Sequence, residues 1–469
     1  MLERNRESEH EGEDRKHTGR SWSESLWAFT FSVILVALFP VGLAAQTASS
    51  GALAPVQAGV LGTGLQTPLR FAGESAPANQ FSLSMGASTL YDDNIWANNA
   101  DRLGDEALSF TSDLDVSRQT EHLTINFDYV PFFMLYRQYD QFDRLNQSAS
   151  LGLTYRLTSR FNLGLHDTFS YQNGAYPSLA GQQILSGPAS PTALNQMIFA
   201  PTTRTLSNMA GLDLTFVKSP RTSFTFSGGY NLLKFGSQTG ANQPLYNDNG
   251  MSGGLGFQYR VTAHTSLGFL LLYQDTTYQG GQAFGNRQRS QIESAFLSVG
   301  FRLSPTITAT IYGGPQYVRL IGGAEASAGT SGQFHGAGGG SITKEVKGTA
   351  LDLSLQRSIS DSAGLYTAAI NTNASFGVRR RLVGRWEANL YGGAARADTS
   401  LIQFADARTD ALSGGIDFSR PIRGGSVIRV SYYTTHQVSK GNPPILAAFD
   451  RNQVTIGFSY RLKTISLGR

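Results

Sequence analysis

The stretch LGLTYRLTSRFNLGLHDTF, from Leu151 to Phe169, contains one complete structural unit of this chain. Apolar residues occupy alternate positions from Leu151 to Leu157, and small or polar residues lie between them. This alternation predicts a β-strand, because successive side chains of a strand point to opposite faces. A polar turn follows at Thr158–Arg160, and the alternation resumes at Phe161. The stretch therefore predicts a β-hairpin.

The end of that first strand recurs along the chain. An aromatic residue, an arginine and an apolar residue precede a polar residue at Tyr155–Thr158, Tyr259–Thr262, Phe301–Ser304 and Tyr460–Lys463. An aromatic side chain on the apolar face next to a turn is typical of a transmembrane β-barrel, because the lipid-facing band of such a barrel ends in aromatic girdles.

Composition narrows the class of protein. The chain has 469 residues, of which 40% are hydrophobic and 15% charged, and this excludes both a disordered chain and a helical membrane protein. It has no cysteine, so disulfides and cysteine metal sites are absent. The hairpin pattern runs without a linker from about residue 80 to residue 462, which favours one closed sheet over several domains.

The N-terminal region predicts an export signal. Residues 1–25 are polar, and Leu26–Ala45 is apolar throughout with small residues at its end. We expect residues 1–45 to be a signal peptide that is cleaved after Ala44 or Ala45. An uncleaved anchor is the alternative, because about 20 apolar residues can span a bilayer. Residues 46–79, rich in small residues, predict a flexible periplasmic lead-in to a barrel at 80–469.

Turn lengths predict the topology. Short turns such as Ser304–Thr306 alternate with longer loops such as Gln172–Thr203, and the pattern adds up to about 18 strands, with a range of 16–18. We therefore predict an all-β fold, a single transmembrane antiparallel up-and-down β-barrel, with the short turns and both termini on the periplasmic side. The loop Gln172–Thr203 is the predicted constriction of the lumen.

The alternation also assigns the two faces of the sheet. Apolar sets such as Leu123 to Tyr129 at odd positions are expected to face lipid, and the polar residues between them the lumen. The charged residues predicted to line the lumen are Asp128, Arg156, Asp213, Arg302, Asp352, Asp417 and Arg461. Asp167 falls on the lipid face of its strand, and this position suggests a β-bulge or a shifted register.

Charge is unevenly distributed between the two ends of the predicted barrel. Basic residues are concentrated beside the short turns, whereas the long loops are more acidic. Arginine and lysine at a membrane boundary explain part of this pattern, because their apolar stems lie along lipid while their charges reach water. The other interpretation is an electrostatic funnel that attracts anionic solutes to the periplasmic mouth.

The sequence carries no catalytic or metal-binding motif. The histidines of the predicted mature region show no metal-ligand spacing and accompany no nucleophile motif. We therefore expect no catalytic residues, no metal and no cofactor. A hydrolase assembled from residues on different strands is the least favoured alternative.

The first predicted strand carries a family resemblance. Its sequence ASTLYDDNI, Ala87–Ile95, resembles the opening of porin families described as outer-membrane β-barrel proteins, some of them associated with exopolysaccharide systems. Within it, Tyr91, Asp92, Asp93 and Asn94 have two interpretations. Paired carboxylates next to an amide could bind a divalent cation, or an Asx-rich turn could end the strand.

These observations predict an outer-membrane pore for passive diffusion or export of small or anionic solutes, with saccharides as one class. A barrel with a structural or surface-display role and no conducting lumen is the alternative. The expected partners are outer-membrane lipid, the barrel assembly machinery and a polysaccharide or anionic solute, and we expect no binding of nucleic acid.

Overall fold

The computed structural model describes residues 79–100, 102–173, 204–236, 246–279, 288–322, 332–360, 368–398, 408–441 and 448–467. The chain divides into two compact units, 1–47 and 48–469, and every described residue belongs to the second. Its long strands are β1 (Gln80–Asp92), β2 (Asp105–Gln119), β3 (Leu123–Tyr136), β4 (Arg144–Arg156), β5 (Phe161–Asn173), β6 (Arg204–Ser219), β7 (Thr222–Phe235), β8 (Asn247–Arg260), β9 (Thr265–Gln279), β10 (Gln288–Ser304), β11 (Ile307–Ile321), β12 (Gly332–Val346), β13 (Thr349–Ser360), β14 (Ala369–Arg381), β15 (Glu387–Asp398), β16 (Arg408–Pro421), β17 (Ser426–Lys440) and β18 (Phe449–Arg461).

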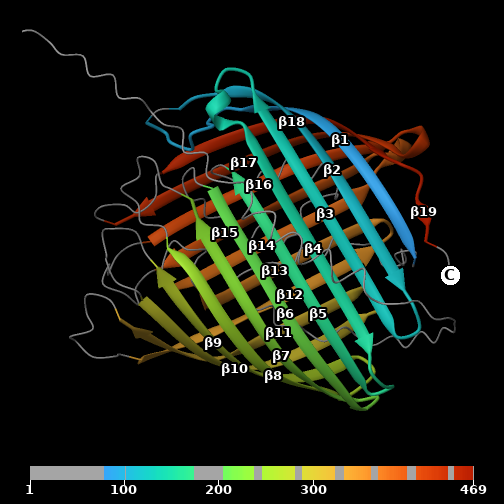
Figure 1. The fold of residues 1–469 in the computed structure, drawn as a ribbon, viewed down its shortest axis with the longest axis vertical. Coiled ribbons are helices and arrows are strands. Elements are labelled where there is room, and N and C mark those ends of the chain that lie inside the picture. Colours follow the sequence, from blue (N-terminus) through green and yellow to red (C-terminus); the bar gives the residue numbers. More distant parts are fainter. Residues whose placement is uncertain are drawn as a thin grey trace, which may run out of the picture. The chain divides into compact units, whose positions relative to one another are not determined.

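The strands close into one barrel (Figure 1). Each pairs antiparallel with its sequence neighbours, and β1 also pairs with β18 from Ser84 opposite Arg461 to Asp92 opposite Gln453. The two-residue strand β19 (Ile465–Ser466) continues this edge by pairing with the start of β1. The prediction of an all-β, up-and-down barrel of 18 strands is confirmed. A barrel of this strand number is wide enough for an aqueous channel.

The short turns reflect their local sequence. The hairpin between β12 and β13 turns at Lys347 and Gly348, whose φ angles are 46° and 77°. Positive φ at both central residues characterises the type I′ turn, which matches the twist of the flanking strands. Elsewhere the described ranges contain three-residue 3-10 helices, η2 (Asp140–Phe142), η5 (Val383–Arg385) and η6 (Arg423–Gly425). Within these ranges, no helix is long and apolar enough to cross a membrane.

The outer wall is apolar and the inner wall largely polar. The outward Leu355 of β13 and Ile456 of β18 are 55% and 56% exposed, whereas the inward Ser375 of β14 and Thr455 of β18 are 3% and 4% exposed. An aromatic row follows the outer wall near the short turns, where Phe161 stacks on Phe216 with 4.7 Å between ring centroids. Phe224 and Phe257 continue the row. This arrangement is that of a barrel surrounded by lipid, with a girdle at one boundary.

Asp167 departs from this pattern, and the prediction of a bulge or shifted register for it is wrong. Strand β5 pairs regularly with both β4 and β6, so Asp167 stays on the outward face beside Leu151 and Ala210. Its Oδ1 accepts a hydrogen bond of 2.8 Å from the amide of Asn208, another outward residue on β6. A second polar side chain, rather than a break in the ladder, accommodates the carboxyl group.

Candidate pore lumen and mouth

The register places each of the predicted lumen-lining residues on the inward face of its strand. Arg156 and Asp213, for example, lie on the same side of the ladders as Asn162 and Gly164 of β5, opposite the lipid-facing Leu163. The full set is Asp128 on β3, Arg156 on β4, Asp213 on β6, Arg302 on β10, Asp352 on β13, Asp417 on β16 and Arg461 on β18. These residues are distributed around the barrel and over its height, so they form no single cluster.

A ring of inward arginines lies at the short-turn end of the barrel, which we call the arginine mouth. Its members lie within the last three residues of their strands and are Arg156, Arg260, Arg302, Arg379, Arg381 and Arg461. Arg156 donates to the Glu121 carbonyl at 2.5 Å, and Arg379 forms an ion pair of 2.6 Å with Glu387. Within the described ranges, Arg302 and Arg260 form no ion pair. Arg260 was missed as a site residue, although the same alternation indicates its direction.

Carboxyl groups gather farther along the lumen on β2 and β3. Asp128 pairs in register with Asp115, and Asp113 interacts with Asp128 as well. Neighbouring carboxyl groups of this kind do not all keep their charge, so this side of the wall is acidic but carries less negative charge than three separate aspartates would. The lumen thus combines a basic mouth with an acidic stretch of wall.

A buried charge pair occupies the wall on β15–β17. The Asp417 carboxylate lies 3.2 Å from Arg429 Nε, and the exposed fractions of their side chains are 1% and 9%. The Asn389 amide donates to Asp417 at 3.1 Å. A buried carboxylate needs such partners, so Asp417 interacts with Arg429 and Asn389 of the barrel wall rather than with a solute.

Asp213 and Asp352 also have partners on neighbouring strands. His166 Nδ1 of β5 lies 3.4 Å from Asp213, and the His166 ring passes over Gly211, where a Cβ would be 2.0 Å from Nε2. Glycine is therefore needed at 211 for the ring to reach Asp213. Asp352 accepts a hydrogen bond of 2.9 Å from the Thr343 hydroxyl of β12.

Apolar side chains narrow the loop end of the barrel on the β1–β3 side. The inward Leu90, Phe132, Met134 and Tyr136 pack with Ile95 and Phe142 from the following segments. The second half of β3 reads VPFFMLY and is apolar on both faces, so alternation alone does not reveal this cluster. Most of the predicted constriction loop, residues 174–203, lies outside the described residues.

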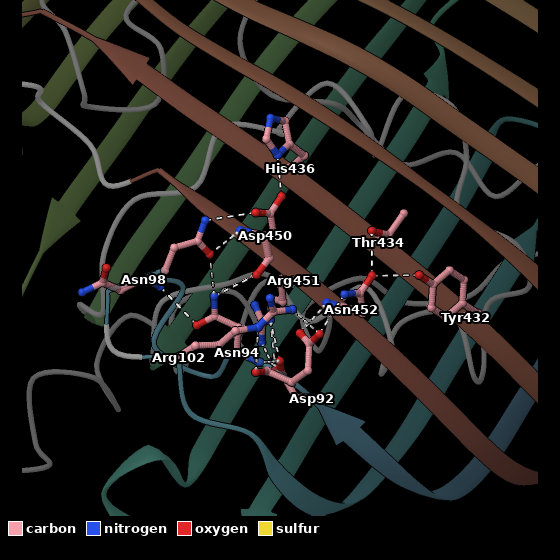
Figure 2. Close-up of polar contacts among 12 residues, drawn as sticks. Asp92, Asn94, Asn98, Arg102, Tyr432, Thr434, His436, Asp450, Arg451 and Asn452 are labelled. Carbon is pink, nitrogen blue, oxygen red and sulfur yellow. Dashed lines mark hydrogen bonds and ion pairs between the residues drawn. The ribbon is translucent and has the colours of Figure 1, made fainter.

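The Tyr91–Asn94 motif lies where the first and last strands meet, and we call its buried part the closing cluster (Figure 2). The Asp92 carboxylate, which is fully buried, accepts two hydrogen bonds of 3.0 Å from Arg451 Nε and one of 3.0 Å from Gln453. Arg451 Nη2 also contacts it. The Asn94 backbone N–H donates to Asp92 Oδ1 at 3.1 Å, which is the contact of an Asx turn.

The remaining motif residues lie on the outer rim. Asp93 accepts hydrogen bonds of 2.6 and 2.7 Å from the backbone and side chain of Asn452, and it forms an ion pair with Arg102. Tyr91 points outward and is 52% exposed. Both carboxylates therefore have protein donors, and in the described ranges no three acidic or histidine side chains are arranged to hold a metal ion.

Comparison with known proteins gives no family assignment. No family model and no curated protein matches the chain. Among solved structures, the chain is similar to Pseudomonas aeruginosa OpdO, with 11% identity, a TM-score of 0.42, and coverage of 82% of this chain and 98% of that one. The chain is also similar to Pseudomonas aeruginosa OccK2 in complex with glucuronate, with 11% identity, a TM-score of 0.41, and coverage of 82% of this chain and 98% of that one.

The ferric citrate transporter FecA gives 11% identity and a TM-score of 0.42, and the match covers 78% of this chain but 61% of the transporter. Values this low carry no argument about relatedness or function. The barrel rests on the strand pairing of the chain itself.

Proposed function

We propose that this chain is an outer-membrane pore that admits or exports small anionic solutes, saccharide acids among them. The arginine mouth is the observation that supports this function most directly. Its six guanidinium groups come from β4, β8, β10, β14 and β18, so they surround the opening rather than line one side. Arginine stays charged at any physiological pH, and fixed charge around an opening raises the local concentration of counter-ions.

The apolar outer wall supports the membrane location. The sequence supports export of the chain itself, because Leu26–Ala45 has the composition of a signal peptide. We propose that cleavage there leaves residues 46–79 as a periplasmic lead-in. On this proposal the short turns and both termini are periplasmic, and the arginine mouth faces the periplasm.

Ion selectivity in planar bilayers tests the proposal. The reversal potential under a salt gradient should indicate anion preference at 0.1 M salt, where the screening length is about 10 Å, and the preference should fade near 1 M, where it is about 3 Å. Replacing Arg156→Glu and Arg302→Glu together should reduce or invert it.

The matched control makes the same charge change on the outer wall. Arg118 and Arg380 lie near short turns but on outward positions, so Arg118→Glu with Arg380→Glu should leave the reversal potential unchanged. A purified barrel that inserts but does not conduct would favour a structural role. Cation selectivity at low salt, which the carboxyl groups of β2 and β3 could produce, would refute the anion proposal.

A further inference from the structure

The ladder between β12 and β13 ends before either strand does. It runs from Val346 opposite Thr349 to Gly338 opposite Arg357. Beyond that point β12 continues to Gly332 along β11, and β13 continues to Ser360 along β14. In the described ranges, the segment Gly332–Ala337 of β12 therefore lacks a ladder partner on its β13 side, and the two strands separate toward the loop end.

The end of β13 turns to the inside of the wall. Ile359 is 1% exposed and packs against Ile292 of β10 and Val318 of β11. Both of these lie on the inward face. Ile292 is an even number of positions from the lumen-facing Arg302 on β10, and Val318 is an even number of positions from Thr308, the partner of Arg302, on β11. The side chain of Ile359 thus covers an apolar patch that belongs to the inner surface of strands β10 and β11.

One side chain takes the place of the missing ladder contact. The Ile359 backbone N–H donates to Gln316 Oε1 of β11 at 2.9 Å. The amide nitrogen of Gln316 in turn donates to Ser294 of β10 at 3.0 Å, and Gln316 is 1% exposed. On the side away from β14, a single amide therefore contacts the end of β13, where a continued hairpin with β12 would have used several backbone hydrogen bonds.

A groove of about 520 Å³ crosses the outer wall beside this separation. Its lining includes the large side chains Leu255, Leu271, Tyr273, Tyr317 and Phe334 and the smaller residues Gly253, Ala295 and Pro315. Phe334 belongs to the unpaired segment of β12 and is 75% exposed. The volume is within the range of about 300–1,000 Å³ that ligand pockets occupy. Because the wall faces lipid, the apolar lining suits an acyl chain.

The loop side of the groove is polar. Arg319 lies one outward position beyond Tyr317, and its guanidinium carbon is 5.8 Å from the centre of that ring. Within the described ranges Arg319 forms no ion pair, whereas Arg289 nearby is bound by Asp275. Glu293 is the charged residue of the groove lining itself. An anionic headgroup therefore has its best position at Arg319, away from Glu293.

We propose that the separation between β12 and β13 is a lateral portal, through which a single-chain amphiphile with an anionic headgroup passes between the membrane and the lumen. The outer groove receives the acyl chain, and the inner patch of Ile292 and Val318 receives it when the end of β13 moves aside. When no amphiphile is bound, the hydrogen bonds of Gln316 hold the portal closed. The proposal requires a barrel in a membrane but not anion conduction, so the two proposals can fail independently.

Fluorescence quenching from the membrane tests the portal. The chain has no native cysteine, so a bimane label can be placed at one site at a time. The sites are Phe334→Cys in the groove, Leu320→Cys on the inner face of β11, and Ser150→Cys on the inner face of β4 as the distant control. Nitroxide-labelled stearate, delivered only in the vesicle membrane, should quench the first two labels and not the third.

Two variants connect this quenching to the portal. Gln316→Leu removes the acceptor of the Ile359 N–H, and it should raise the quenching rate at residue 320 at least twofold. Ala295→Trp fills the groove and should abolish quenching at 320, whereas the label at 334, which faces lipid, should still be quenched. Ala309→Trp, at an outward position of the same strand as Tyr317 but near the short turn, is its matched control and should change neither.

The proposal is overturned if residue 320 is quenched no faster than residue 150. It is also overturned if Ala295→Trp leaves quenching at 320 unchanged, since the stearate would then have entered through a mouth of the barrel. Ala295→Trp changes the lipid-facing wall and leaves Gln316 in place. The test therefore holds even if Gln316→Leu fails to fold.

Discussion

Removing Arg451 should destabilise the barrel more than any change on its rim. The substitution Arg451→Met keeps the apolar length of the side chain but deletes the guanidinium that binds the Asp92 carboxylate. Asp92 is 0% exposed and Arg451 5% exposed, so water does not replace the lost donor. Breaking a buried ion pair on one side costs about 3–5 kcal/mol, because it leaves an uncompensated buried charge.

A double variant separates the cost of the unpaired charge from the net contribution of the Asp92–Arg451 pair to stability. Asp92→Leu combined with Arg451→Met removes both charges, and it should recover most of the lost stability, since apolar replacements of buried pairs are often close to neutral. Asp93→Ala on the half-buried rim removes one ion pair and two hydrogen bonds from Asn452, and it should cost about 1–2 kcal/mol, because a typical net hydrogen bond contributes about 0.5–1.5 kcal/mol and a rim ion pair little.

Urea titration of the reconstituted barrel, followed by tryptophan fluorescence, measures the free energy of unfolding of each variant, and the coupling energy follows from the double-mutant cycle. The reasoning is refuted if Arg451→Met is as mild as Asp93→Ala. It is equally refuted if the double variant is less stable than both single variants, because the cluster would then hold β1 to β18 by something other than paired charge.

Two further predictions concern orientation and the inner wall. Tags inserted in Gln279–Arg287 should be reachable on intact cells and tags in Ser304–Thr306 should not; the reverse labelling would overturn the orientation but not the barrel. Gly211→Ala places a Cβ 2.0 Å from the His166 ring and should cost about 1–3 kcal/mol of stability, whereas Gly228→Ala, with nothing within 4 Å, should cost less than half as much by the same titration.

Period-two alternation is a local property, and it accounts for what could be predicted correctly. The strands, their inward and outward faces and the short turns depend on residues close together in sequence, so LGLTYRLTSRFNLGLHDTF already indicates a hairpin. The strand count followed from repeating that unit. Even β12, whose glycines weaken the pattern, forms at Gly332–Val346.

The direction of each lumen-facing arginine is similarly local, but its partners are not. Alternation assigns Arg156 and Arg302 to the face opposite the apolar set, the strand register is consistent with that parity, and their role in lining a lumen stays a prediction. It did not reveal that Arg379 is bound to Glu387 while Arg302 forms no ion pair in the described ranges, because those contacts depend on how neighbouring strands align.

Only the closed barrel decides the remaining features. Asp92 meets Arg451 across 359 positions of sequence, and this contact exists because the first strand pairs with the last. Asp167 remains on the lipid face because Asn208 of the next strand satisfies it. The separation of β12 from β13 depends on the packing of Ile359 on two other strands. Local periodicity fixes which face a side chain takes, whereas the shape of the closed sheet fixes what that side chain meets.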